Sequence, residues 1–202
     1  MLYINPDNPQ QRLIDMAVTV LKRGGIVCYP TDTVYGMGCD MFNQKAVKRL
    51  YKLKGRAKHK PFSFICGADL KNVSTYCSMS NMAYRVMKKH LPGAYTFVLP
   101  AMKVVPKIMI TKQKTVGIRA PDNEICRLLV AGLGNPLVTT SAGRAGEEPP
   151  ASAYDLDQVF GSQVDEIIDG GDIFPRPSSV IDLTGGHPEI IRAGLGPVDD
   201  IV

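Results

Sequence analysis

A dense cluster of cations lies between Tyr51 and Phe64. This segment has the sequence YKLKGRAKHKPFSF and contains no carboxylate beside its basic residues, Lys52, Lys54, Arg56, Lys58, His59 and Lys60. In an extended segment after Gly55, Lys54 and Arg56 could converge on one anion. A helix dipole stabilises cations near its C-terminus by about 0.3–1 kcal/mol each, which accounts for only one or two of these residues. The cluster therefore indicates a site for phosphate or carboxylate.

Hydroxyl-rich loops follow two of the expected strands, at the place where α/β sheets bind ligands. Residues 30–38, PTDTVYGMG, supply Thr31, Asp32 and Thr33 directly after a strand. Residues 137–150, LVTTSAGRAGEEPP, end a strand in hydroxyls and glycines whose N–H groups could form a nest for an anion. Later candidates of the same kind are Ser178, Ser179 and Arg192. Each motif taken alone is also explained by an ordinary turn.

Residue spacing argues against several other kinds of site. The three histidines, His59, His90 and His187, lack the spacing of metal ligands, and the five cysteines form no Cys-x-x-Cys pair. The chain contains no P-loop, no Gly-x-Gly-x-x-Gly fingerprint and no Gly-x-Ser-x-Gly motif. What remains is chemistry that binds and positions anions with few titrating groups.

Charge is distributed unevenly along the 202 residues, although the net charge is only +5. Residues 41–121 contain 17 Lys and Arg and a single acid, Asp69, whereas residues 122–202 contain 4 basic and 14 acidic residues. This asymmetry favours one surface or cleft for a polyanion. A lysine-rich helix face that serves solubility is the alternative.

Length and composition predict one globular domain, residues 1–202. No apolar run approaches the roughly 18 residues of a membrane span. The N-terminus MLYINPDNPQQ lacks the basic-then-apolar order of a secretory signal. We therefore expect a cytoplasmic protein with no membrane partner.

The elements that must position these side chains alternate along the chain. Helices are expected at residues 9–23, 43–56, 80–90, 122–134 and 155–160. Strands are expected at residues 26–29, 62–66, 95–100, 115–121, 136–142, 164–168, 178–183 and 189–194. Asn8 and Asn43 are expected to cap the first two helices, and residues 30–38 to form a turn. Strands that alternate with helices early and pair with each other late predict an α/β domain with a mixed sheet.

Seven motifs in this order resemble the YrdC/TsaC family: YPTDTVYGMGCD, KGRAKHKPF, LPGAYTFVLP, TVGIRAP, TTSAGRAGEEPP, PSSVIDL and IRAG. The match covers nearly the whole chain, and INPDNPQQRL and STYCSMSNMAYRVMK are most similar to the YciO branch. The resemblance implies a YrdC-like fold, a twisted mixed β-sheet with flanking helices around a concave cationic cleft. It also implies a nucleotidyltransferase that makes threonylcarbamoyl-AMP from ATP, bicarbonate and L-threonine for tRNA modification. Mg²⁺ would accompany ATP, and members of the family bind double-stranded RNA or tRNA.

The resemblance also assigns roles to single residues. It implies that Lys54, Arg56 and Ser141 are catalytic. Nucleotide contacts are implied for Arg56, Lys60, Thr115, Ser141 and Arg192. Threonine contacts are implied for Thr33, Arg119, Thr139 and Ser178. Arg119 corresponds to the arginine that binds the threonine carboxylate, a bidentate task that suits a planar guanidinium. No protein ligand to a metal is implied.

One departure from the family pattern lies in the expected reacting centre. Synthases of the family have Ser-x-Asn where this chain has Ser141-Ala142-Gly143. A hydrogen bond to a charged group is worth about 1.5–3 kcal/mol, so its loss would slow a reaction more than tenfold. In addition, Lys60 and Ile65 replace an asparagine and a histidine seen in other members.

Three hypotheses follow from the motifs and this departure. The chain is a threonylcarbamoyl-AMP synthase, or a YciO-type protein that binds nucleotide and RNA with weak or no synthase activity, or an RNA-binding module alone. Intact Thr33, Arg119 and Ser178 favour the first hypothesis, because an RNA-binding module has no need of a threonine pocket. Gly143 and the YciO-like flanks favour the second.

Overall fold

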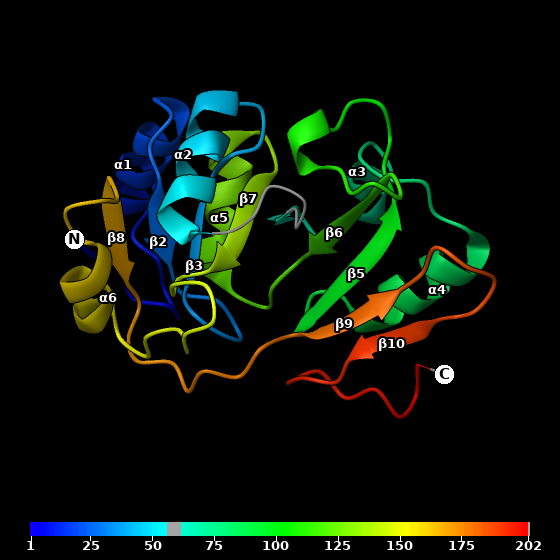
Figure 1. The fold of residues 1–202 in the computed structure, drawn as a ribbon. Coiled ribbons are helices and arrows are strands. Elements are labelled where there is room, and N and C mark those ends of the chain that lie inside the picture. The colour runs from blue at the N-terminus through cyan, green and yellow to red at the C-terminus, as the bar shows by residue number, and fades with distance from the viewer. Residues whose placement is uncertain (56–61, 202) are drawn as a thin grey trace.

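The structure, a computed structural model, describes residues 1–55 and 62–201 and has the predicted α/β architecture (Figure 1). Its strands are β1 (Leu2–Tyr3), β2 (Val27–Tyr29), β3 (Gly36–Asp40), β4 (Ser63–Ile65), β5 (Tyr95–Pro100), β6 (Thr115–Arg119), β7 (Leu137–Ser141), β8 (Glu166–Asp169), β9 (Ser179–Asp182) and β10 (Glu189–Arg192). Its helices are α1 (Gln11–Lys22), α2 (Gln44–Lys54), α3 (Leu70–Val73), α4 (Asn81–His90), α5 (Glu124–Leu133) and α6 (Ala153–Phe160), with one 3₁₀ turn, η1 (Lys107–Met109).

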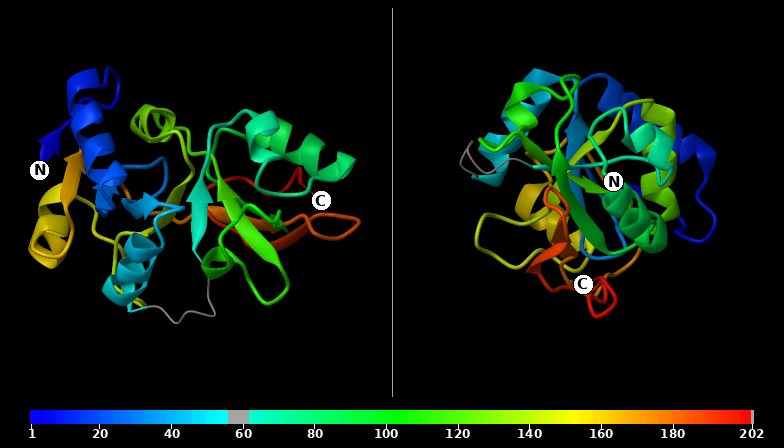
Figure 2. Two further views of the ribbon diagram at one scale, coloured as in Figure 1. Left: turned by 90° about the horizontal axis from the view of Figure 1, so that it is seen from above. Right: turned by 90° about the vertical axis from the view of Figure 1, so that its right-hand side faces the viewer.

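The ten strands form one twisted sheet (Figure 2) in the order β1-β8-β2-β3-β7-β4-β6-β5-β9-β10. Parallel pairs (β1–β8, β2–β8, β4–β6, β5–β9) and antiparallel pairs (β2–β3, β3–β7, β4–β7, β5–β6, β9–β10) both occur, so the sheet is mixed as predicted. No helix of the described residues is long and apolar enough to cross a membrane.

Helices cover the two ends of the sheet differently. At the β1 end, α1 and α5 pack against one face and α2 and α6 against the other (Figure 2). At the β10 end, α3 and α4 cover one face only. The period of two along β5 fits this arrangement, because Tyr95, Phe97 and Leu99 are buried in the core with α4, while Thr96 and Val98 lie on the other face. That uncovered face is the floor of a cavity.

The predicted elements are confirmed with two exceptions. Asn43 caps α2 by accepting a hydrogen bond from the Ala46 N–H at 3.0 Å. The predicted cap at Asn8 is wrong, because α1 begins at Gln11 and its N-cap, Gln10, makes no side-chain cap bond. The predicted turn over residues 30–38 is also only half right, since residues 36–40 form β3 between β2 and β7. The glycines that suggested a turn lie inside a strand.

Gly38 has no space for a side chain. A Cβ at Gly38 would lie 2.0 Å from the backbone oxygen of Val138, whereas a Cβ at Gly67 would meet nothing within 4 Å. We expect Gly38→Ala to lower the free energy of unfolding by about 3 kcal/mol, because β3 and β7 must separate. Urea denaturation of Gly38→Ala beside Gly67→Ala measures this difference. Equal stabilities of the two variants would contradict the close approach of these strands.

Candidate functional site

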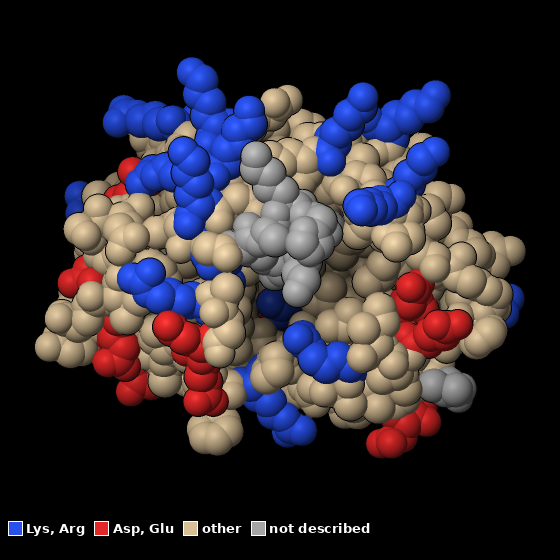
Figure 3. All heavy atoms as spheres, viewed as in Figure 1, with Lys and Arg blue, Asp and Glu red and all other residues tan. Residues whose placement is uncertain are grey.

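A cavity of about 580 Å³ opens on the uncovered face of the sheet (Figure 3). Its lining comes from β4, β5, β6, β7, β9 and β10, with the loop between β2 and β3 and the segments around residues 148–149 and 175–178. From β5 the alternate residues Thr96 and Val98 reach it, whereas β7 contributes the consecutive residues Thr139, Thr140 and Ser141. The volume lies in the range of about 300–1,000 Å³ that is typical of small-molecule sites.

The cavity brings together most of the residues that the sequence singled out. They come from five separate parts of the chain, and the ones that line the cavity are Thr33, Thr115, Arg119, Thr139, Ser141, Ser178 and Arg192. Lys54 lies beside this group and not in the lining. Arg56 and Lys60 lie outside the described residues, so their predicted roles stay predictions.

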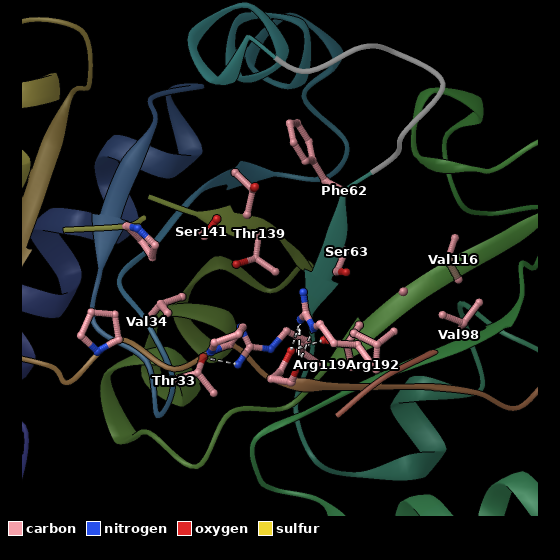
Figure 4. A pocket seen from close by; sticks show the side chains of 18 of the residues that line it. Thr33, Val34, Phe62, Ser63, Val98, Val116, Arg119, Thr139, Ser141 and Arg192 are labelled. Atoms are coloured by element: carbon pink, nitrogen blue, oxygen red, sulfur yellow. Dashed lines mark hydrogen bonds between the residues drawn. The ribbon is translucent and has the colours of Figure 1, made fainter. Parts of the chain in front are cut away.

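Arg119 is the more deeply buried of the two arginines in the described lining of the cavity (Figure 4). It is 8% exposed, and its terminal nitrogen Nη2 donates to Asp32 Oδ1 at 3.1 Å and to Thr33 Oγ1 at 2.8 Å. Its Nε is buried and has no hydrogen-bond partner within the described residues. A buried donor without a partner costs free energy, and a ligand oxygen at this place would remove that cost.

Charge around Arg119 is only partly balanced. Burial raises the pKa of the Asp32 carboxyl, while Arg119 and the N–H of Asp122 act in the opposite direction. Burial lowers the pKa of the Arg192 guanidinium, and the positive charge of Arg119 lowers it further. Two guanidinium groups that repel each other in one cavity favour the binding of an anion.

A second group of side chains surrounds Ser178, the residue directly before β9. Arg192 donates to the backbone oxygen of Ser178 at 2.8 Å through Nη2 and at 3.1 Å through Nε. The hydroxyls of Ser178 and Thr96 lie 2.9 Å apart. Arg192 therefore fixes the segment that carries Ser178, in addition to bringing a positive charge to the cavity.

Lys54 contacts the end of β7 and the start of the loop that follows it. It is 6% exposed, and its Nζ donates to Ser141 O at 2.8 Å, to Ser141 Oγ at 3.1 Å and to the backbone oxygen of Gly143. The residue lies in the last turn of α2, so the helix aims the ammonium at this loop. These contacts show that Lys54 positions Ser141. A direct catalytic role for Lys54 and for Ser141 stays a prediction.

We expect Lys54→Met to lower the free energy of unfolding by about 2–3 kcal/mol, because three buried or partly buried oxygens lose a charged donor. Limited proteolysis should then cut residues 142–150 faster than in the wild type. Lys52→Met, an exposed neighbour in the same turn, is the matched control. If both variants unfold at the same urea concentration, the three hydrogen bonds do not stabilise the loop.

Several residues of the lining belong to none of the motifs that the sequence singled out. Thr96, Ser63 and Gly117 lie on the cavity floor, and Glu148 lies at its exposed rim. The alternation of YTFVLP would have identified Thr96, because its apolar neighbours must face the core. Glu148 gives no such signal, since its place depends on how the loop after β7 folds back.

Cations gather around the cavity more than inside it. Figure 3 shows two groups of Lys and Arg side chains on either side of the hollow, over α2 and over the connection between β5 and β6. The first contains Lys45, Lys48, Arg49 and Lys52, and the second contains Lys103, Lys107, Lys112 and Lys114. The described lining itself contains two arginines and one glutamate. The expected cationic cleft thus stays a prediction. No group of three or more potential metal ligands occurs among the described residues.

Comparison with known proteins gives matches along the whole chain. The sequence model named for Sua5, YciO and YrdC and described as "Telomere recombination" matches residues 19–194. YciO of Escherichia coli, described as uncharacterized, is 40% identical over 198 residues, which cover 97% of this chain and 96% of that protein. The crystal structure of E. coli YciO has a TM-score of 0.94 at 39% identity and covers 100% of this chain and 98% of that chain.

Named enzymes match as well. The threonylcarbamoyl-AMP synthase of Thiobacillus denitrificans is 34% identical over 174 residues, 86% of this chain and 91% of that protein. The crystal structure of Pyrococcus abyssi Sua5 complexed with L-threonine has a TM-score of 0.92 at 31% identity. It covers 100% of this chain and 60% of that chain, so this chain spans a little over half of that relative.

Proposed function

The chain belongs to the Sua5, YciO and YrdC family, and on that premise we propose that it is a threonylcarbamoyl-AMP synthase-like nucleotidyltransferase. Its substrates would be ATP, bicarbonate and L-threonine, and its product would serve tRNA modification in the cytoplasm. The observation that supports the proposal is the buried Arg119, which lines a ligand-sized cavity and whose Nε has no hydrogen-bond partner among the described residues.

The threonine subsite lies around Arg119 in this proposal. A carboxylate placed beside Arg119 accepts from its guanidinium, whose Nε has no partner within the part of the chain that the structure describes. The hydroxyls of Thr33, Thr139 and Ser178 line the same cavity and offer further polar contacts to an amino acid. The similarity to Sua5 complexed with L-threonine supports this assignment.

The nucleotide subsite takes the rest of the cavity, with Thr115, Ser141 and Arg192 in its lining. Arg192 brings positive charge to the phosphates of ATP, and Mg²⁺ accompanies ATP as part of the substrate. The predicted contacts of Arg56 and Lys60 would complete this subsite.

The chemistry that these residues serve has two steps. The threonine amine takes up the carbon of bicarbonate, with loss of water, to give a carbamate. A carbamate oxygen then displaces pyrophosphate from the α-phosphorus of ATP and forms threonylcarbamoyl-AMP. The protein contributes by placing two anions next to each other and by stabilising the charge that develops on the phosphates.

The test is a direct assay of the purified chain with ATP, Mg²⁺, bicarbonate and L-threonine. Mass spectrometry should detect threonylcarbamoyl-AMP and pyrophosphate, and both should disappear when L-threonine is left out. Product that forms equally without threonine, or no product above the level of a heat-treated sample, would overturn the proposal.

A second candidate is a YciO-type nucleotide- and RNA-binding protein with weak or no synthase activity. Gly143 favours this candidate, because it stands where the Ser-x-Asn motif of the synthases has an asparagine. The identity of 40% to YciO, against 34% to the T. denitrificans synthase, favours it too. Exposed lysines on both sides of the cavity would then bind the RNA backbone.

Substitution of Lys48 and Lys52 by alanine tests the RNA contact. Both are exposed on α2, so we expect weaker binding of tRNA and a salt dependence reduced by about one to two units of slope, since fewer counterions are released. Affinity for ATP should stay the same. Lys22→Ala with Arg23→Ala, at the end of α1 on the opposite face of the sheet, is the control. An unchanged slope would mean that the outer face of α2 is only solvated.

A further inference from the structure

We propose that Tyr29 is a positioning residue, which fixes the hydroxyl of Thr139 as a hydrogen-bond donor toward the carboxylate of an amino-acid ligand. The proposal rests on the proposed function, because it concerns the same threonine subsite. Tyr29 lies on β2 and is fully buried, so it touches no ligand itself. It acts on the cavity through Thr139 of β7.

The contact between Tyr29 and Thr139 crosses a whole strand. In the sheet order, β3 separates β2 from β7. Tyr29 is paired with Gly36 of β3, and Gly38 is paired with Thr139. The Oη atom of Tyr29 lies 2.9 Å from Thr139 Oγ1. The tyrosine side chain therefore passes over β3 to reach β7.

The two glycines of β3 make this crossing possible. A Cβ at Gly36 would lie 2.7 Å from Cε2 of Tyr29, and a Cβ at Gly38 would lie 2.8 Å from its Oη. Any larger residue at either place would push the ring away from Thr139. This explains why a buried strand of the sheet contains Gly-x-Gly, a pattern that usually weakens strands.

The direction of the hydrogen bond between Tyr29 and Thr139 determines what Thr139 can offer to a ligand. Tyr29 donates to Thr139 Oγ1, and within the described part of the chain it is the only hydrogen-bond partner of that hydroxyl. Burial raises the pKa of the Tyr29 phenol well above its ordinary value, so the donor keeps its proton. The proton of the Thr139 hydroxyl stays available for an acceptor in the cavity that Thr139 lines. A carboxylate oxygen, which only accepts, matches this donor.

Calorimetric titration of the full chain with L-threonine tests the proposal. We expect Tyr29→Phe to weaken binding by about tenfold, because Thr139 loses its orienting donor. Tyr95→Phe is the matched control, since its phenol also donates one hydrogen bond of 2.9 Å, to the backbone oxygen of Pro197. Both variants should lose similar thermal stability, but Tyr95→Phe should bind L-threonine within twofold of the wild type.

A double-mutant cycle with Thr139→Val separates positioning from a general loss of structure. If Tyr29 acts through Thr139, the variant with both substitutions should bind no more weakly than Thr139→Val alone. The inference would be overturned if the losses of L-threonine affinity from the two single substitutions multiply in the double variant. It would also be overturned if Tyr29→Phe binds L-threonine as tightly as the wild type. In both cases the threonine site itself would stand. No binding of L-threonine to the wild type would overturn the proposed function and the inference together.

If Tyr29→Phe does not fold, NMR of the wild-type chain tests the proposal instead. With carbon-13 at the tyrosine Cζ, addition of L-threonine should shift the resonance of Tyr29, because its hydrogen-bond acceptor changes partners. The resonance of Tyr95 should stay in place. A Tyr29 signal that does not move at saturating L-threonine would overturn the inference.

Discussion

Arg119→Gln is expected to weaken L-threonine binding by about 100-fold, because a carboxylate loses a charged donor pair in a buried site. Arg119 is 8% exposed, and water cannot readily replace it. Glutamine keeps a hydrogen-bonding group, on a shorter side chain, and removes the charge. Calorimetric titration measures the loss directly, and the synthase assay should lose its threonine-dependent product in parallel.

The substitution also leaves Asp32 without its cation, so a stability effect must be separated from the binding effect. Arg119→Gln combined with Asp32→Asn removes both charges of the pair and restores stability if the buried carboxylate is the cause. Binding of L-threonine should stay weak in this variant. Arg127→Gln, which removes an exposed arginine paired with Glu124 on α5, is the control and should bind normally. Wild-type affinity in Arg119→Gln would remove the threonine subsite from this cavity.

Most elements could be predicted because each depends on a local pattern. The stripe of Val47, Leu50 and Tyr51 in α2 and the alternation in β5 bury apolar side chains whatever the rest of the chain does. β3 could not be found in this way. Its glycines fit a turn until the ring of Tyr29 is known to lie over them, and that contact joins residues of three strands.

The same distinction applies to the site. The motifs identified Arg119, Thr139 and Ser178, and the cavity brings them together. Lys54 could not be assigned from spacing, because a lysine near a helix end is usually exposed, whereas this one is buried against the loop after β7. Its burial depends on the path of that loop, which the sequence leaves open.

Gly143→Asn is expected to raise the rate of threonylcarbamoyl-AMP synthesis more than tenfold. The asparagine would restore the Ser-x-Asn of the synthases, and one hydrogen bond to a charged group is worth about 1.5–3 kcal/mol. The backbone of Gly143 lies outside the left-handed region, so an asparagine is not strained there. The rate is measured as pyrophosphate release that depends on L-threonine.

The space around Gly143 is tight for any side chain, so the control for Gly143→Asn must impose the same steric shift. A Cβ would lie 3.0 Å from Cα of Pro149 and 3.5 Å from the backbone oxygen of Glu148, so the loop must shift by a few tenths of an ångström. Gly143→Ala imposes the same shift and adds no amide. We therefore expect Gly143→Ala to keep the wild-type rate or to lower it, while Gly143→Asn raises it. If both variants have the same rate, the missing asparagine does not limit synthesis, and other features must distinguish this chain from the synthases.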